Sequence, residues 1–119
     1  WSRQCYVGSS FIRPNEVPSR HEVGVDSIMW GSDYPHKEMS FPYSLQALRA
    51  AFSDCEKSEV EQMLGLNAAD VYGFDLKKLA PIAEKVGPKV SDVATVLLKG
   101  EIPKEAERCP AFVGLTADV

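Results

Sequence analysis

Basic blocks and long apolar runs are missing from this sequence of 119 residues. Acidic and basic residues interleave along the chain and leave a net charge of −4, which offers little to the phosphates of nucleic acid or to anionic lipid. No apolar stretch approaches the roughly 20 residues of a membrane helix, and the first residues lack the apolar core of a signal peptide. We therefore expect a cytoplasmic protein that binds neither nucleic acid nor membranes.

Cysteine is scarce as well. Cys5, Cys55 and Cys109 are odd in number and far apart, and they form no Cys-x-x-Cys pair of the kind that holds zinc or exchanges disulfides. We expect reduced thiols in a reducing compartment. The first residue is Trp1 rather than methionine, and on that ground we interpret the chain as part of a longer protein.

Two short apolar stretches predict β-strands. Residues 5–7 run into a Gly-Ser-Ser segment, and residues 28–30 end at Gly31. The second stretch lacks the polar alternation of a half-exposed strand, which is typical of a parallel strand that is buried on both faces. Between the strands, residues 19–23 predict a short helix that ends before Gly24.

Most of the chain after these strands predicts helices. Pro42 suits the first position of a helix whose Leu45, Leu48 and Phe52 share one face. A second helix is expected from about Glu56 to a C-terminal cap at Gly65. The next two helices have predicted N-caps of their own, at Asn67 and Asp75.

A last helix is expected from a cap at Ser91 to Gly100, and Gly87 and Pro88 separate it from the helix before it. Residues 101–119 carry prolines and charges and predict an extended tail. The fold class is thus α/β, with about two strands followed by four or five helices. Two parallel strands cannot shield their own edges, so we expect the missing strands upstream, in sequence outside this chain.

The most reactive side chains come directly after the second predicted strand, in Gly31-Ser32-Asp33-Tyr34-Pro35-His36. In parallel α/β folds, ligands bind at the carboxyl ends of the strands, so Asp33 is expected to project from the rim of the sheet into a pocket. The alternative is an ordinary turn, in which the Asp33 carboxylate accepts backbone hydrogen bonds and His36 is solvated.

A family resemblance rests on this stretch. Residues 28–36, with Asn67-Ala68-Ala69 and residues 71–74, resemble the C-terminal end of the amidohydrolase superfamily. The nearest branch is the amidohydrolase-2 group, which contains metal-dependent hydrolases and non-oxidative decarboxylases similar to aminocarboxymuconate semialdehyde decarboxylase and resorcylate decarboxylase. The resemblance covers residues 5–76.

The resemblance implies a fold. Members of the group are distorted (β/α)8 TIM barrels, in which residues 5–7 would be the seventh strand and residues 28–30 the eighth. Residues 1–75 would then be the last strands and helices of the barrel, and residues 76–119 a helical extension and tail. As an isolated chain, such a fragment is expected to be mostly helical.

The resemblance also implies a metal site. Asp33 corresponds to the aspartate that binds the catalytic metal, zinc or manganese, and would serve as ligand and general base. His36 corresponds to the family's histidine after the proline and is expected to face the pocket. The family's other ligands are histidines on strands that this chain lacks, and a catalytic zinc usually needs three protein ligands. The chain alone is therefore expected to bind no metal and to be inactive.

Two hypotheses for function follow. In the first, the chain is the C-terminal part of a metal-dependent amidohydrolase-type enzyme that hydrolyses or decarboxylates a small carboxylic or cyclic substrate. In the second, it is a non-catalytic helical interaction module that docks onto a partner. Apolar faces without their barrel neighbours would drive association, so we expect a homo-oligomer.

Overall fold

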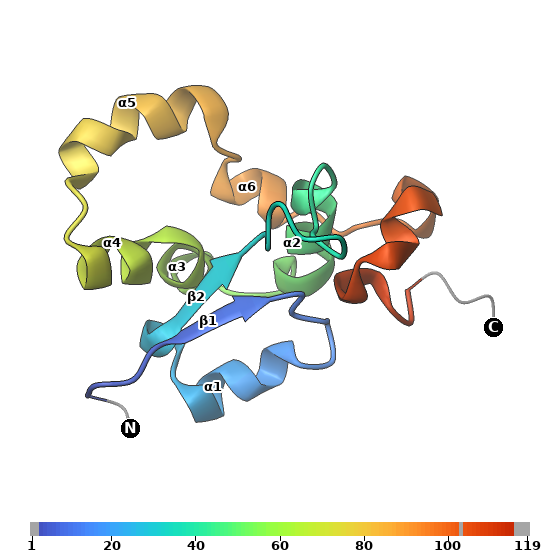
Figure 1. Ribbon diagram of the computed structural model, residues 1–119, viewed down its shortest axis with the longest axis horizontal. Coiled ribbons are helices and arrows are strands. Elements are labelled where there is room, and N and C mark those ends of the chain that lie inside the picture. Colours follow the sequence, from blue (N-terminus) through green and yellow to red (C-terminus); the bar gives the residue numbers. More distant parts are fainter. Residues whose placement is uncertain (1–2, 103, 116–119) are drawn as a thin grey trace.

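Two parallel strands lie at the centre of the fold (Figure 1). The computed structural model describes residues 3–102 and 104–115. Within them, β1 (Val7–Ser10) pairs with β2 (Ile28–Gly31), and Val7 lies opposite Ile28. The predicted pair is therefore present, but its first member is not at residues 5–7. The ladder with β2 decides the position of β1, and it includes the Gly-Ser-Ser segment rather than the exposed Tyr6.

The connection between the strands is a crossover with helical turns, as is usual for a parallel pair. It contains the 3-10 turn Val17–Ser19, α1 (Arg20–Val23) and the 3-10 turn Val25–Ser27. The predicted short helix is therefore confirmed, and it ends at Gly24, whose φ of 106° is accessible to few other residues.

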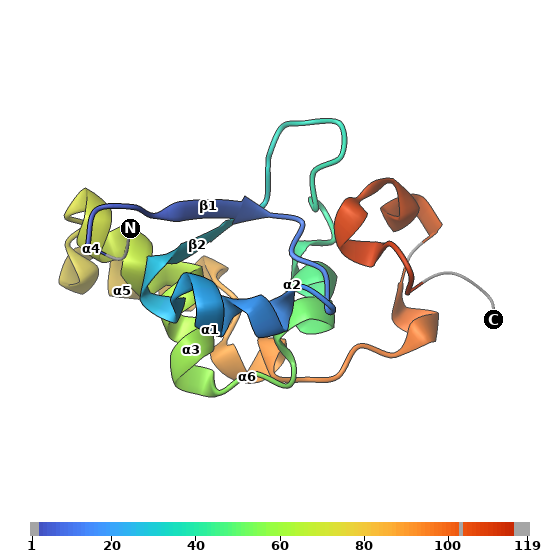
Figure 2. The same ribbon diagram turned by 90° about the horizontal axis from the view of Figure 1, so that it is seen from below.

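The two faces of the strand pair differ. The face that carries Val7, Ile28 and Trp30 packs on helices, and Figure 2 shows α1, α2, α3 and α6 on one side of the strands. On the opposite face, a Cβ added to Gly8 would meet no atom of the described chain within 4 Å. In β2, Ile28 is buried, but the next three residues are half-buried, so the expectation of burial on both faces is wrong for this chain.

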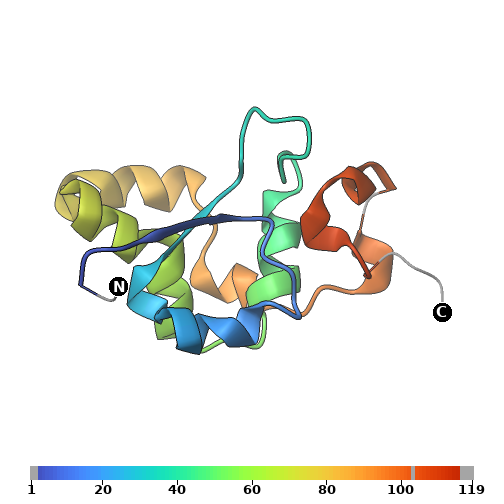
Figure 3. The ribbon, with the colours of Figure 1, turned by 60° about the horizontal axis from the view of Figure 1, so that its bottom comes forward.

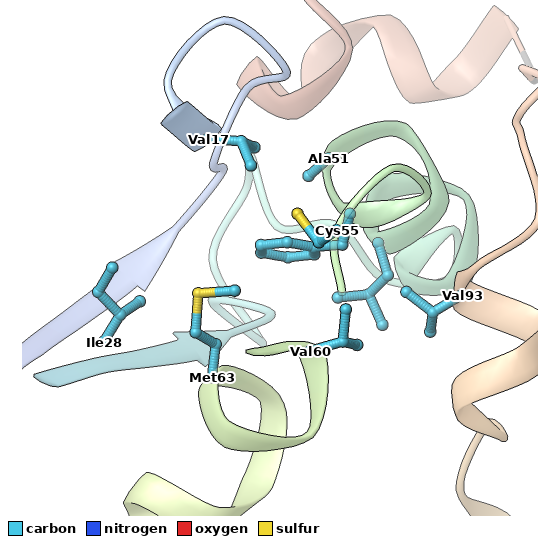
Figure 4. Packing of buried hydrophobic residues seen from close by; sticks show 9 residues of the cluster. Val17, Ile28, Ala51, Cys55, Val60, Met63 and Val93 are labelled. Atoms are coloured by element: carbon cyan, nitrogen blue, oxygen red, sulfur yellow. The ribbon is translucent and has the colours of Figure 1, made fainter. Parts of the chain in front are cut away.

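The main core lies between the strands and α2 (Ser44–Phe52), α3 (Lys57–Glu61) and α6 (Val90–Val93). Figure 4 shows its side chains converging from these elements. Phe52 and Val60 are each 1% exposed at its centre. The buried members are Val17, Ile28, Leu48, Ala51, Phe52, Cys55, Val60, Met63 and Val93.

The start of α2 differs from the prediction. The helix begins at Ser44, and Pro42 belongs to the preceding loop, where its peptide bond with Phe41 is cis. A turn in which the Tyr43 N–H donates to the Ser40 carbonyl closes this loop before the helix can begin. Leu45 is 39% exposed, so it lies at the edge of the face that Leu48 and Phe52 bury.

A continuous helical segment replaces the predicted second and third helices. α3 runs into a π-helical turn (Gln62–Leu66), which runs into α4 (Asn67–Tyr72). Gly65 therefore lies inside the turn rather than at a C-cap. Asn67 has helical dihedrals, φ −60° and ψ −46°, so the predicted N-cap is also wrong. Its side chain bonds to the strand region instead of to its own helix.

α5 (Leu76–Val86) has both predicted ends. The Asp75 carboxylate accepts hydrogen bonds from the N–H groups of Lys77 and Lys78 at 3.1 and 3.2 Å, and the helix stops at Gly87. Every residue of α5 is exposed. Figure 1 shows α5 as an arch that stands away from the strands.

The C-terminal region is folded rather than extended. α6 has its N-cap at Lys89 instead of Ser91 and ends at Val93 rather than Gly100. The 3-10 turns Lys99–Glu101, Lys104–Arg108 and Pro110–Phe112 follow, while residues 103 and 116–119 lie outside the described part of the chain. The last two turns bury Ala106, Cys109, Ala111 and Phe112 against Ala47 of α2.

This C-terminal segment lies beside α2 in Figures 1 and 3. Arg49 of α2 holds the start of this segment, residues 95–101, by hydrogen bonds. The guanidinium donates to the carbonyls of Thr95 and Val96 at 2.9 and 2.7 Å, and to both carboxylate oxygens of Glu101 at 3.0 and 2.8 Å. Composition favours an extended tail, but these contacts with a distant helix decide its structure.

Candidate functional site

A loop of residues 32–43 follows β2 and carries both predicted site residues. Its base is closed by Ser40, whose N–H and hydroxyl both donate to the Ser32 carbonyl, at 3.0 and 3.4 Å. Ser40 is 3% exposed and also shares a hydrogen bond with Ser44 at the start of α2. Figures 2 and 3 show the loop rising from the end of β2, so a closed base holds an exposed tip.

Asp33 and His36 form a tight turn inside this loop. The His36 N–H donates to the Asp33 carbonyl at 2.8 Å, and the peptide bond between Tyr34 and Pro35 is cis. The ring of Tyr34 meets that of Phe41 edge to face, with centroids 5.5 Å apart. The turn is thus held by a backbone hydrogen bond between Asp33 and His36 and by the contact of Tyr34 with Phe41.

Both strands are followed by a residue with a left-handed backbone. Asp33 has φ 59°, and Phe11, directly after β1, has φ 60°. Aspartate tolerates this region because its short side chain can bond locally, whereas a bulky residue such as phenylalanine rarely adopts it. Such outliers cluster at functional sites, and here they mark the carboxyl ends of both strands.

The turn brings the two predicted site residues together. His36 Nδ1 lies 3.3 Å from Asp33 Oδ2, an ion pair when the imidazole is protonated. The Asp33 side chain is 32% exposed and that of His36 is 71% exposed. The contact with the imidazole is not part of the ordinary turn described above, whereas the high exposure of His36 agrees with that turn.

The sequence gives no hint that Cys109 approaches this site. Burial raises the pKa of the Cys109 thiol, and the negative charge of Asp33 adds to the rise. Cys109 belongs to the C-terminal segment, which packs on Ala47 of α2. Phe11 and Tyr43 pack against the same segment, so it borders the rim where both strands end.

A hollow of about 250 Å³ lies beside the strand pair and α4. Strand residues and α4 line it, and Asp33 and His36 do not. Its lining is Gly8, Ser9, Ser10, Met29, Trp30, Gly31, Ala68 and Tyr72. The small residues leave room beside the end of β2, directly before the loop that carries Asp33.

Asp33 and His36 are residue types that bind metals, but two residues are too few for a complete site. A carboxylate and an imidazole are both zinc ligands, whereas a catalytic zinc site usually has three protein ligands. Within residues 3–102 and 104–115, no group of three His, Cys, Asp or Glu side chains could hold a metal ion. Asp33 and His36 can thus be only part of a ligand set.

Asn67 has a role that its predicted position as an N-cap conceals. It is 2% exposed, and its amide nitrogen donates to the carbonyls of Val25 and Ile28 at 2.8 and 2.6 Å. Its oxygen accepts a hydrogen bond from Gln62. In the sequence, the signal for such a buried amide is an Asn among apolar residues in a helical segment. The same pattern also fits an N-cap, so the sequence does not distinguish the two roles.

Two parallel strands joined by a helical crossover define an α/β domain, and in such domains ligands bind beyond the carboxyl ends of the strands. The sequence model described as Amidohydrolase matches residues 4–74, which is more than half of the chain. The chain therefore belongs to the amidohydrolase family, and the predicted resemblance is confirmed at this level. No curated protein and no solved structure matches the chain.

The match includes both strands, the loop with Asp33 and His36, and the helices through α4, and it ends before α5. Membership indicates a part of a hydrolase-type enzyme. In the portion of the chain that the structure describes, no helix is long and apolar enough to cross a membrane.

Proposed function

We propose that this chain is the C-terminal part of a metal-dependent amidohydrolase-type enzyme. In this proposal, β1 and β2 are the last two strands of a (β/α)8 barrel, and α5 and the C-terminal segment are an extension of it. The family match supports the hydrolase class.

The strand pair supports the barrel. Buried parallel sheets have more than two strands and helices on their faces. Here, each strand has one unpaired edge in the described part of the chain, and one face carries small residues beside a hollow. Further parallel strands would cover both edges. In a closed barrel the open face would then point inward, and active sites of such barrels lie at the carboxyl ends of the strands.

The position of Asp33 is the single observation that carries the functional proposal. The carboxylate follows a parallel strand, at a left-handed residue, in contact with His36. We assign it as one ligand of a mononuclear zinc or manganese site and as a general base that accepts a proton from the reacting water. A metal bound there would supply a Lewis acid. The remaining ligands would come from outside this chain, which alone binds no metal.

His36 orients the Asp33 carboxylate in this proposal. A carboxylate that binds a metal is commonly held by a further polar contact, which fixes the oxygen that faces the ion. The 3.3 Å contact with Asp33 Oδ2 is such a restraint.

The substrate is proposed to be a small carboxylic or cyclic molecule in the cytoplasm. Hydrolysis is the first choice because of the family. Non-oxidative decarboxylation is the second, on the resemblance to the decarboxylases of the amidohydrolase-2 group. One carboxylate can serve both reactions.

A non-catalytic interaction module is the second candidate function. The exposure of every residue of α5 favours it, because Leu76, Leu79, Ile82 and Val86 leave an apolar surface that a protein partner could cover. In that case, the loop after β2 would have no metal role.

The test is Asp33→Asn in the enzyme that contains this chain, purified without chelator. We expect about one equivalent of zinc or manganese in the wild type, as for a mononuclear site. The variant should lose the metal, and its activity should fall more than about 100-fold, beyond the usual effect of residues that merely support ligands. Metal content by mass spectrometry and a hydrolase screen are the measurements.

Asp54→Asn is the matched control, since Asp54 is an exposed carboxylate after α2. It should keep both metal and activity. Wild-type metal content and activity in Asp33→Asn would contradict the proposal, and a wild type without metal would favour the interaction module.

A further inference from the structure

The amide of Asn67 joins the helical segment to the strand that precedes the candidate site. Its two N–H groups are both used, one by the Val25 carbonyl in the crossover and one by the Ile28 carbonyl at the start of β2. Its oxygen accepts from Gln62. A buried amide with donors and acceptor all paired is stiff, because any displacement leaves a desolvated polar group without a partner.

The π-helical turn explains why these groups meet. In a π-helix the backbone bonds join residues five apart, so Gln62 and Asn67 lie one above the other. The Asn67 N–H donates to the Gln62 carbonyl, and the two side chains also bond. π-helical turns are frequent at functional sites. This one aims Asn67 at the start of β2.

Apolar packing alone would not fix β2 along its axis relative to the helical segment. Met63 and Val60 bury the same helical segment in the core at 2% and 1% exposure. The ladder with β1 fixes β2 only relative to β1, and the apolar contacts with the helical segment are non-directional. The two hydrogen bonds from Asn67 act on fixed carbonyl groups, so they resist sliding.

The position of Ile28 determines the position of the carboxyl end of β2. Ile28 is its first residue and Gly31 its last, which is about 10 Å of extended chain at roughly 3.3 Å per residue, and Asp33 lies in the loop two residues after Gly31. An extended strand is already near full length, so a displacement of Ile28 reaches the loop almost undiminished.

We propose that Asn67 is a positioning residue that fixes β2 along its axis and thereby sets the place of Asp33. This inference rests on the proposed function, in which Asp33 binds a metal. Asn67 touches neither metal nor substrate, and it acts through β2.

The main test is Asn67→Asp in the enzyme that contains this chain. The substitution keeps the size of the side chain but replaces the amide nitrogen by an oxygen. That oxygen cannot donate to the carbonyls of Val25 and Ile28. The affinity for added Zn²⁺ should fall by about 10-fold to 100-fold, the range for residues that hold ligands in place. In the 119-residue chain, amide hydrogen exchange at residues 28–31 should become about 10-fold faster or more.

Val93→Ala is the control for a general loss of stability. Val93 is 1% exposed and lies on α6, which packs on α2 and α3. This variant should be destabilised but keep its zinc affinity when compared at equal folded fraction. Gln62→Ala is the milder test, usable if Asn67→Asp does not fold. It leaves both donors in place, and we expect about a threefold to tenfold loss of affinity for one missing hydrogen bond.

The two readouts separate the possible failures. Wild-type zinc affinity in Asn67→Asp, or a loss no larger than in Val93→Ala, would overturn the inference and leave the proposed function intact. A wild type that binds no zinc would overturn the proposed function. The exchange rates would then still decide whether Asn67 fixes β2, and unchanged rates at residues 28–31 would overturn that as well.

Discussion

The contact between His36 Nδ1 and Asp33 Oδ2, 3.3 Å long, is the basis of a prediction at the scale of single residues. His36→Ala should reduce the activity of the enzyme that contains this chain by about 10-fold to 100-fold, because the Asp33 carboxylate loses the contact that orients it. The effect should be smaller than that of Asp33→Asn. Measured kcat and KM are expected to show the loss mainly in kcat.

His21→Ala is the matched control, because His21 is also an exposed histidine beside a carboxylate, 3.6 Å from Glu59, but lies on α1. It should leave the activity unchanged. Full activity in His36→Ala would instead mean that His36 is a solvated turn residue.

Local chemistry decides which site residues the sequence can predict. Asp33 and His36 are three residues apart, and the turn between them needs only short-range contacts, so their meeting follows from the motif. Asn67 is different, since its partners Val25 and Ile28 are 42 and 39 residues away. An N-cap and a buried amide use the same residue type, and only the tertiary fold distinguishes them.

At the scale of elements, the bond between Arg49 and Glu101 predicts a pH dependence. The Arg49 guanidinium, with a backbone hydrogen bond from Leu98, holds the pKa of the Glu101 carboxyl below its ordinary 4.5. A carboxyl group whose pKa is lowered by folding stabilises the folded state above its unfolded pKa. This stabilisation should be lost as the pH falls through the lower folded pKa.

Urea unfolding near neutral pH and well below pH 4.5 measures this effect. Glu101→Gln should lose less stability on acidification than the wild type, because it lacks the titrating group. Glu105→Gln, at an exposed carboxylate of the next turn, is the control and should follow the wild type. Identical acid dependence in the wild type and Glu101→Gln would contradict the prediction.

Local boundary signals predicted both ends of α5, but they misplaced other helix ends, at Pro42, Gly65, Asn67 and Ser91. α5 begins at the Asp75 cap and ends at Gly87, both of which are visible in the sequence. The C-terminal segment has no such signals. Arg49 of α2 bonds to Thr95, Val96 and Glu101, which are 46 to 52 residues later in the chain. The last two 3-10 turns pack on Ala47 of the same helix.

At the scale of the whole molecule, the chain is less compact than expected for a globular domain of its length. Its radius of gyration is 14.4 Å, against about 13.5 Å for a globular domain of this size. The arch of α5 contributes to the difference, with Ile82 58% and Val86 79% exposed. We propose that the isolated chain forms a homo-oligomer that covers such surfaces, because exposed apolar patches drive association.

Sedimentation and the binding of an apolar dye test this proposal. The wild-type chain should sediment above the monomer mass and bind the dye, and Ile82→Lys with Val86→Lys should shift it toward the monomer. Lys77→Glu, which changes a charge on the same helix, should leave the association nearly unchanged. A wild-type monomer that binds no dye would contradict the proposal.

The π-helical turn between α3 and α4 has a consequence for changes in chain length. A π-helical turn holds one residue more than an α-helical turn. If Gly65 were deleted, Gln62 and Asn67 would stand four residues apart in a regular α-helix, which again places one above the other. Asn67 would still face β2. The segment therefore carries one spare residue at a place where its deletion would leave the helix on either side unrotated.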